Sequence, residues 1–139
     1  MSQNNTEGHI VEKWGDDGLC LGWTAVPSAL IFLQSRLGLT STDLNVLLNL
    51  MIHWWKPDDK IYPSQDSIAN RMGVSKRTVQ RTLDRLVEMG FIEIIKTKRN
   101  GRYKGRNIYN LKPLAMIIDT MAPSIKDSMN ISKEKVDEK

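Results

Sequence analysis

Side chains that donate hydrogen bonds or carry positive charge are concentrated in one short stretch of the sequence. Lys76, Arg77, Gln80 and Arg81 follow closely after Ser75. An arginine guanidinium can form two parallel hydrogen bonds with a pair of acceptors, and a glutamine amide can donate and accept at once. Lysine and serine side chains bind phosphate oxygens. This stretch therefore has the chemistry to recognise planar hydrogen-bonding groups that lie next to phosphates.

Positive charge surrounds the same stretch. The 139 residues include 20 Lys and Arg and 16 Asp and Glu, a net charge of +4. Residues 76–106 contain ten of the basic and only three of the acidic side chains, so this segment carries +7 and the remainder −3. A basic segment on a mildly acidic chain is typical of a surface that binds nucleic acid. Charge alone fits a solvated surface equally well, so the positions of the residues must decide.

Two short helices are expected to position this stretch. The first, over residues 65–72, begins after Ser64 and ends at Gly73, while the second begins after Ser75 and runs over 76–89. Serine is a preferred residue at the start of a helix, and glycine adopts the left-handed conformation that ends one. Because so short a turn separates them, the two helices must cross steeply, as in a helix-turn-helix.

The second helix has distinct inward and outward faces. Val79, Leu83 and Leu86 recur at helical spacing and are expected to point inward. The outward face offers groups that match base edges in the major groove of DNA. We predict base contacts from Arg77, Gln80 and Arg81. We predict phosphate contacts from Ser75, Lys76, Thr78 and Arg85. The alternative is a capped, solvated surface helix.

A β-hairpin is predicted directly after the two helices. Residues 91–99 and 102–111 flank Asn100-Gly101, a pair typical of a two-residue type I′ turn. This turn would pair Arg99 with Arg102 and Ile92 with Tyr109, and it would place Ile92, Ile94, Tyr109 and Leu111 on one face. Gly105 would allow a bulge.

The tip of this hairpin, or wing, is strongly basic. It carries six cations and no acid: Lys96, Lys98, Arg99, Arg102, Lys104 and Arg106. Two arginines that face each other across a turn repel, and a phosphate backbone would relieve that repulsion. We therefore predict contact with the DNA backbone or minor groove. The alternatives are a solvating loop, or an edge strand protected by lysines.

Further helices are predicted on both sides of this unit. One runs from Pro27 to Leu37, is apolar on nearly all sides of its first half, and ends at Gly38. The next begins with a capping box formed by Thr40 and Asp43, and it runs to about Trp55. Its predicted apolar stripe consists of Leu44, Leu47, Leu48, Met51 and Trp55. A short helix with Leu114, Ile117, Ile118 and Met121 on one side follows the hairpin.

These elements divide the chain into three predicted parts. Residues 1–23 read as a flexible or extended arm, 24–122 as one domain, and 123–139 as a charged tail that lacks the apolar content to fold alone. The helices over 27–37 and 114–121 are candidate surfaces for a homodimer, which would place two DNA-binding domains on a DNA site with two-fold symmetry. The alternative use of both surfaces is to close the core of the domain itself.

The remaining residues favour no catalytic class. Cys20, His9 and His53 do not have metal-ligand spacing, and one cysteine cannot form a disulfide framework. The sequence has no glycine-rich phosphate loop and no evident nucleophile set. We therefore expect no enzymatic activity, no cofactor and no small-molecule substrate. The apolar runs are far shorter than the ~20 residues of a membrane span, so we expect no membrane partner and a cytoplasmic location.

The stretch QDSIANRMGVSKRTVQRTLD, residues 65–84, resembles the helix-turn-helix signature of bacterial DNA-binding proteins. Ala69 is small where the two helices touch, Gly73 is at the turn, and Ile68, Val74 and Val79 are apolar between the helices. With the preceding helix and the hairpin, residues 40–112 resemble a winged helix-turn-helix domain. They are similar to those of plasmid and phage replication proteins and related regulators.

The resemblance implies a mainly α fold with a small β-hairpin wing, to which this chain adds an N-terminal helix and a short C-terminal helix. It implies a sequence-specific protein that binds double-stranded DNA at the bacterial nucleoid, with the second motif helix in the major groove. A transcription regulator is favoured, because 139 residues leave little room for the further domains of an initiator. The alternatives are a replication initiation or accessory factor of a plasmid or phage, and a winged helix that binds protein.

Overall fold

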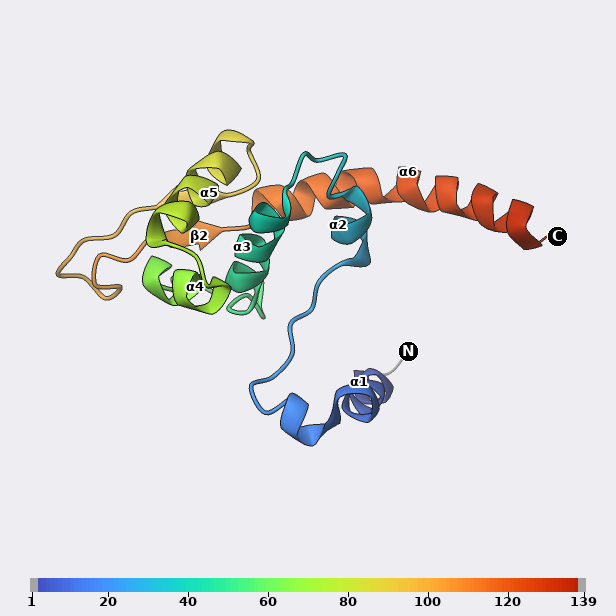
Figure 1. Cartoon of the computed structure of the whole chain (residues 1–139), viewed down its shortest axis with the longest axis horizontal. Coiled ribbons are helices and arrows are strands. Elements are labelled where there is room, and N and C mark those ends of the chain that lie inside the picture. Colours follow the sequence, from blue (N-terminus) through green and yellow to red (C-terminus); the bar gives the residue numbers. More distant parts are fainter. Residues whose placement is uncertain (1–2, 138–139) are drawn as a thin grey trace.

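The computed structural model describes residues 3–137, and side chains within residues 8–130. Six helices and two strands follow one another along this part of the chain: α1 (Gln3–Gly18), α2 (Ser28–Leu33), α3 (Ser41–Met51), α4 (Gln65–Met72), α5 (Lys76–Glu88), β1 (Glu93–Ile95), β2 (Ile108–Asn110) and α6 (Lys112–Asp137). Figure 1 shows α2 to α5, the strands and the first half of α6 packed together, while α1 and the end of α6 extend away. The predicted mainly α fold with a β-hairpin is confirmed.

One apolar core joins the helices to the hairpin. Its fully buried side chains come from α2 to α6 and from the segments around both strands. They include Leu30, Leu47, Ile68, Leu83, Leu86, Ile92, Leu111 and Leu114, each at most 1% exposed. Burial of a leucine or isoleucine side chain stabilises a fold by about 1.5–3 kcal/mol, so this core holds the motif helices and the wing in one unit.

The helix α3 differs from its predicted form. It begins with the predicted capping box, in which the Thr40 amide donates to Asp43 at 2.8 Å and the Asp43 amide donates to Thr40 at 3.1 Å. It ends at Met51 rather than near Trp55, which is 58% exposed. The predicted stripe was too narrow, since Val46 and Leu50 are also fully buried. The reason is that α3 packs against both α4 and α5 and so buries more than one side.

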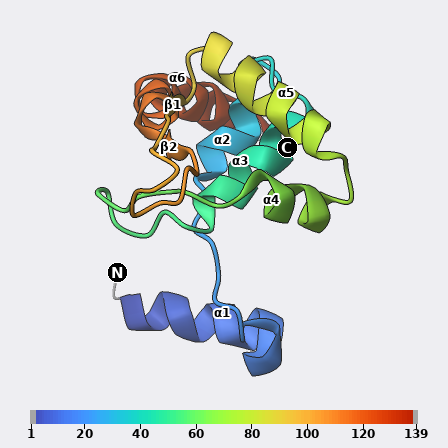
Figure 2. The same cartoon turned by 90° about the vertical axis from the view of Figure 1, so that its left-hand side faces the viewer.

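The first motif helix has the predicted boundaries, and the second ends at Glu88, one residue before the predicted end; both have the predicted caps. The Ser64 and Ser75 hydroxyls each accept a hydrogen bond from the amide three residues later, at 3.1 Å. Gly73 ends α4 with φ 69°, a left-handed conformation that glycine adopts without strain. The chain then turns directly into α5. Figure 2 shows that α4 and α5 cross steeply, as predicted from the short turn.

The hairpin forms with a different register and turn. Ile94 pairs with Tyr109, not Ile92 as predicted, so the register is shifted by two residues. Because side chains alternate between faces, this even shift keeps Ile92 and Tyr109 buried as predicted. Tyr109 also donates from its amide to the Ile61 carbonyl at 2.8 Å, which adds the short extended segment before α4 to the hairpin edge.

The tip closes through a wider loop, so the predicted type I′ turn at Asn100-Gly101 is wrong. The positive φ angles fall on Lys104 and Gly105 instead. The Lys98 carbonyl accepts from the amides of Gly101 at 3.0 Å and Gly105 at 3.1 Å. A Cβ on Gly105 would lie 3.3 Å from the Arg99 Cα, so glycine is needed there for space and for conformation. Arg99 and Arg102 therefore lie in this loop and do not face each other across a tight turn.

The secondary structure of the flanking segments differs from the prediction at three places. The region predicted as a flexible or extended arm forms α1, bent at Gly15, where φ is 78°. The helix predicted from Pro27 to Leu37 ends at Leu33, although Gly38 has the predicted positive φ. The helix predicted to stop before the charged tail continues through Pro123 to Asp137.

A physical reason for the longer α6 lies in its sequence. Residues 112–137 contain no glycine, and proline removes only one backbone donor at position 123. Beyond Pro123, Ser124 donates from its hydroxyl to the Met121 carbonyl, and Ser128 donates to Ser124, both at 3.1 Å. None of the helices described has the length and hydropathy that crossing a membrane requires.

Candidate nucleic-acid interface

The first half of α5 presents its polar side chains to solvent. Arg77, Gln80 and Arg81 are exposed, while Val79 is fully buried one residue before Gln80. The predicted inward face is confirmed by Val79 and Leu83, which are at most 1% exposed. The three side chains proposed to read bases thus lie together on the accessible side of one helix.

The start of α5 is held by its own hydroxyl groups. Ser75 accepts from the Thr78 amide, and the two hydroxyl oxygens lie 3.0 Å apart. Lys76 lies 3.7 Å from Asp66 of α4, with both side chains more than half exposed. An exposed ion pair of this kind contributes at most about 1 kcal/mol. Lys76 can therefore exchange this partner for a phosphate at little cost.

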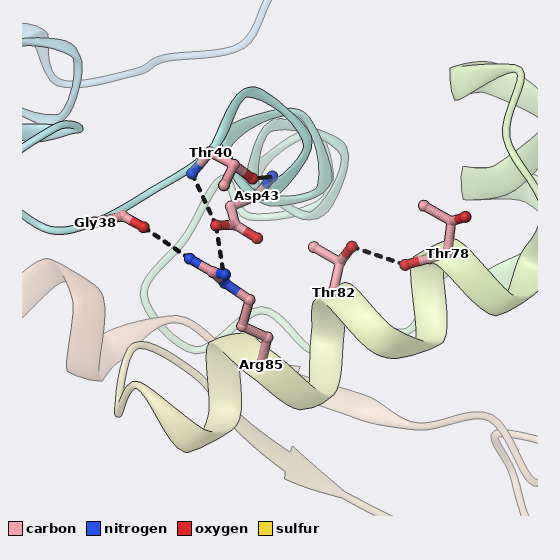
Figure 3. A network of polar contacts seen from close by, with 6 residues as sticks. All are labelled: Gly38, Thr40, Asp43, Thr78, Thr82 and Arg85. Carbon is pink, nitrogen blue, oxygen red and sulfur yellow. Dashed lines mark hydrogen bonds and ion pairs between the residues drawn. The ribbon is translucent and has the colours of Figure 1, made fainter.

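Arg85 has a different place from the one predicted. Its Nε lies 3.2 Å from the Asp43 carboxylate, and its guanidinium donates to the Gly38 carbonyl at 2.9 Å (Figure 3). Asp43 is buried at the start of α3, where it also accepts from the Thr40 amide. Arg85 therefore neutralises a buried carboxylate and ties α5 to α3. We revise its assignment accordingly, because its Nε and one terminal nitrogen already have partners within the protein.

The predicted wing cations are all exposed: Lys96, Lys98, Arg99, Arg102, Lys104 and Arg106. Among the tip residues, Tyr103 instead packs inward against Tyr62, with ring centroids 4.9 Å apart at 69°. The Arg102 guanidinium lies 5.9 Å from the Tyr103 ring. The Thr97 hydroxyl donates to the Arg106 carbonyl at 2.7 Å and closes the base of the loop. The tip is thus a compact loop that carries its charges on the outside.

The wing and the motif helices meet around a hollow of about 250 Å³. Lys76 lines it from α5, while Lys104 and Arg106 line it from the wing. The fold therefore brings Lys76 to the same hollow as Lys104 and Arg106 of the wing, and Asp66, which pairs with Lys76, also lines it. Ser64, Gln65 and Asn107 also line this hollow. The sequence did not predict Gln65 or Asn107 as site residues. Its only signals were that Gln65 follows the helix cap Ser64 and that Asn107 comes at the end of the wing loop.

A second hollow, of about 580 Å³, separates the wing from the later turns of α5. Its lining includes Gln80 as well as Asp84 and Glu88, opposite Lys96 of the wing. Acidic side chains repel phosphate, so the positive surface is confined to the first half of α5 and the wing. Gln80 lies at the boundary between this positive surface and the acidic side chains of the later turns of α5.

The described residues contain one clearly perturbed titratable group, His53, in the turn after α3. The residue is exposed, but partial desolvation of its ring lowers its pKa, and the positive charge of Arg71 lowers it further. His53 lines a third hollow together with Lys60 and Arg106. Within the part of the chain described, no three His, Cys, Asp or Glu side chains lie close enough to hold a metal ion together.

Comparisons with known proteins agree with the helix-turn-helix fold described above. Residues 37–92 match the family described as Helix-turn-helix domain, whereas no curated protein matches the chain. The structure is similar to the N-terminal domain of DnaD protein from Geobacillus kaustophilus, with a TM-score of 0.55 and 19% identity over 94% of this chain and 98% of that one. This likeness shows a shared fold.

Two further solved structures match with lower scores. A possible transcriptional regulator from Methanosarcina mazei has a TM-score of 0.46 and 23% identity, over 74% of this chain and 83% of that chain. The S. aureus MepR–DNA complex has a TM-score of 0.45 and 15% identity, over 97% of both chains. The match over residues 37–92 covers α3 to α5, and together with the hairpin that follows these helices form a winged helix-turn-helix fold.

Proposed function

We propose that this protein binds double-stranded DNA sequence-specifically and regulates transcription without a catalytic step. The first half of α5 enters the major groove, where Arg77, Gln80 and Arg81 contact base edges. The wing lies on the neighbouring backbone or minor groove. The observation that carries the proposal is the convergence of Lys76 of α5 with Lys104 and Arg106 of the wing around one hollow beside exposed base-reading groups.

Phosphate contacts are assigned to both elements. Ser75, Lys76 and Thr78 lie at the start of α5, where the positive end of the helix dipole favours an anion. The wing cations extend this positive surface away from the helices. Arg85 is left out, since it is bound to Asp43.

Pairing of two copies on a two-fold site would strengthen binding. The helices α2 and α6 pack against each other and use Leu30, Leu33 and Leu114 in the domain's own core. Ile31 and Phe32 of α2 stay more than half exposed, as does Met116 of α6. We propose that these exposed side chains form the homodimer surface. Sedimentation that detects only monomer at high concentration would contradict the dimer.

The direct test is selection of bound fragments from a genomic DNA pool, followed by affinity measurements on a selected duplex and on a random one. Promoter fragments are expected for a regulator, whereas fragments around a plasmid or phage origin would favour a replication factor. Failure to bind either duplex in dilute buffer would contradict both and leave a protein-binding winged helix.

The contact of the wing with DNA is tested by the salt dependence of the binding affinity. Arg99, Arg102 and Lys104 changed together to Ala should reduce the slope of log affinity against log salt by about 0.9 for each lost phosphate contact. An unchanged slope would remove the wing from the interface.

A further inference from the structure

The hollow on the far side of the wing from α5 has a composition that the proposed function does not explain. It measures about 320 Å³ and is lined by His53, Lys60, Tyr62, Pro63 and Arg106. We name it the wing-base hollow. Its walls come from the segment between α3 and α4 and from the wing, which lie next to each other in Figure 2. The lining holds two cations and a histidine, with no carboxylate.

Neither cation is neutralised inside the protein. Among the described residues, Lys60 and Arg106 form no ion pair with Asp or Glu. Both side chains are exposed, and the backbone of Arg106 is held in place, since its amide donates to the Tyr103 carbonyl at 3.0 Å and its carbonyl accepts from Thr97. Two positive charges thus line the same hollow and are open to solvent.

The shape of the hollow is maintained by an aromatic contact. Tyr62 stands in its lining and packs against Tyr103 from the wing tip, at 4.9 Å between ring centroids. Aromatic pairs in such an edge-to-face arrangement contribute about 0.5–1.5 kcal/mol beyond their buried area. This contact holds the wing against the α3–α4 segment, so the hollow is formed before any ligand arrives.

The two sides of the wing differ in charge. On the α5 side, Asp84 and Glu88 oppose Lys96, whereas the wing-base hollow contains no acid. The wing-base hollow also shares Pro63 and Arg106 with the hollow in which Lys76 and Lys104 meet. Apart from Asp66, which pairs with Lys76, the Lys, Arg, Asp and Glu side chains that line these two hollows are all cationic, from the start of α5 past the base of the wing to Lys60.

We propose that the wing-base hollow binds a phosphate of the DNA backbone, with Lys60, Arg106 and protonated His53 as its partners. This proposal rests on the proposed function and extends its footprint to the α3–α4 segment. Binding would bring a negative charge next to His53, which shares the hollow with Lys60, Arg106 and Tyr62 and is also influenced by the positive charge of Arg71. The phosphate would favour the imidazolium form, so DNA binding would be coupled to uptake of a proton.

The first experiment measures affinity for a selected duplex between 50 and 200 mM salt. Lys60→Gln should reduce the log–log slope by about 0.9, so that its loss of affinity is about 3.5-fold larger at 50 mM than at 200 mM. Lys56→Gln is the matched control, because Lys56 is exposed on the same segment but does not line the hollow. Equal slopes for wild type and Lys60→Gln, or equal losses in both variants, would overturn the proposal. If wild type binds no duplex, the proposed function itself fails.

The second experiment follows the His53 ring by NMR during pH titration. Addition of the duplex should raise the pKa of His53, and His53→Gln should abolish the corresponding tightening of DNA binding as the pH is lowered. An unchanged His53 titration would overturn the proposal. A shift of equal size with inorganic phosphate at matched ionic strength would mean a small-anion site, and it would overturn the assignment to DNA.

Discussion

The two halves of α5 use the same residue types for opposite purposes. In the first half, Arg77 and Arg81 are exposed next to Gln80, and the helix backbone below them is fixed by the buried Val79. In the second half, Arg85 is bound to Asp43 and Gly38 (Figure 3). Leu86, the next residue, is fully buried. One turn of helix separates Arg81 from Arg85. The role of each arginine therefore depends on which neighbour its turn of the helix faces, not on its charge.

This difference separates stability from recognition. The second half joins α5 to α3 through a buried carboxylate, whereas the first half leaves its donors available. Substitutions of the packed side chains in the second half should alter the free energy of unfolding, and substitutions of the exposed side chains in the first half should alter DNA affinity.

The largest effect is expected from Leu86→Ala. Leu86 is fully buried in the core, so the substitution removes apolar contacts and leaves a cavity, which should cost about 2–5 kcal/mol of unfolding free energy. Urea denaturation measures the loss. The protein that remains folded should keep its salt dependence of DNA binding. A stability equal to wild type would show that the second half of α5 is not the packing half.

The next effect concerns recognition. Arg81→Ala and Gln80→Ala should each weaken binding to a selected duplex by about 1–3 kcal/mol, with little effect on random DNA. Fluorescence anisotropy on both duplexes checks this, and urea denaturation should show a change below about 0.5 kcal/mol. Equal losses on the two duplexes would make these residues phosphate contacts.

Asp43→Ala should have a smaller effect on stability than Leu86→Ala. It removes the capping box of α3 and the partner of Arg85, and we expect a cost of about 1–2 kcal/mol from the cap. Loss of the contact with Arg85 adds little to this cost. The arginine side chain that remains is 46% exposed and can be solvated by water.

Arg85→Ala serves as the companion variant. It should lower the midpoint of urea unfolding but leave the salt slope of DNA binding unchanged, because its guanidinium is used inside the protein. A slope reduced by about 0.9 would restore Arg85 to the phosphate contacts.

The smallest effect concerns pH. The pKa of His53 is lowered by partial desolvation and then by the charge of Arg71. The unfolded chain therefore binds this proton at a higher pH than the folded protein. The contribution of His53 to stability is complete above about pH 6.5 and decreases as the pH falls below that value towards the lowered pKa. Comparison of urea midpoints at pH 7.5 and 5.5 should show a smaller decrease for His53→Gln than for wild type. Equal decreases of the urea midpoint in His53→Gln and wild type would contradict this role of His53.

Local signals predicted the helix-turn-helix unit well. Ser64 and Ser75 begin its helices and Gly73 separates them, and each acts on backbone groups within three residues. The buried positions Val79 and Leu83 follow from helical periodicity alone. The same reasoning was wrong for the wing turn, where Asn100-Gly101 suggested a tight turn. There the loop closes around the Lys98 carbonyl and Tyr103 packs on Tyr62, a contact between residues far apart in sequence.

The sequence by itself determined where the motif helices begin and end, which of their faces is apolar, and where positive charge is concentrated. Capping, glycine conformation and periodicity act over a few residues, so they can be read without knowledge of the fold. Only the tertiary structure decided that Arg85 faces Asp43 and that Lys76, Lys104 and Arg106 meet. These arrangements depend on how the helices and hairpin pack on one core, and that packing joins residues whose separation along the chain carries no local signal.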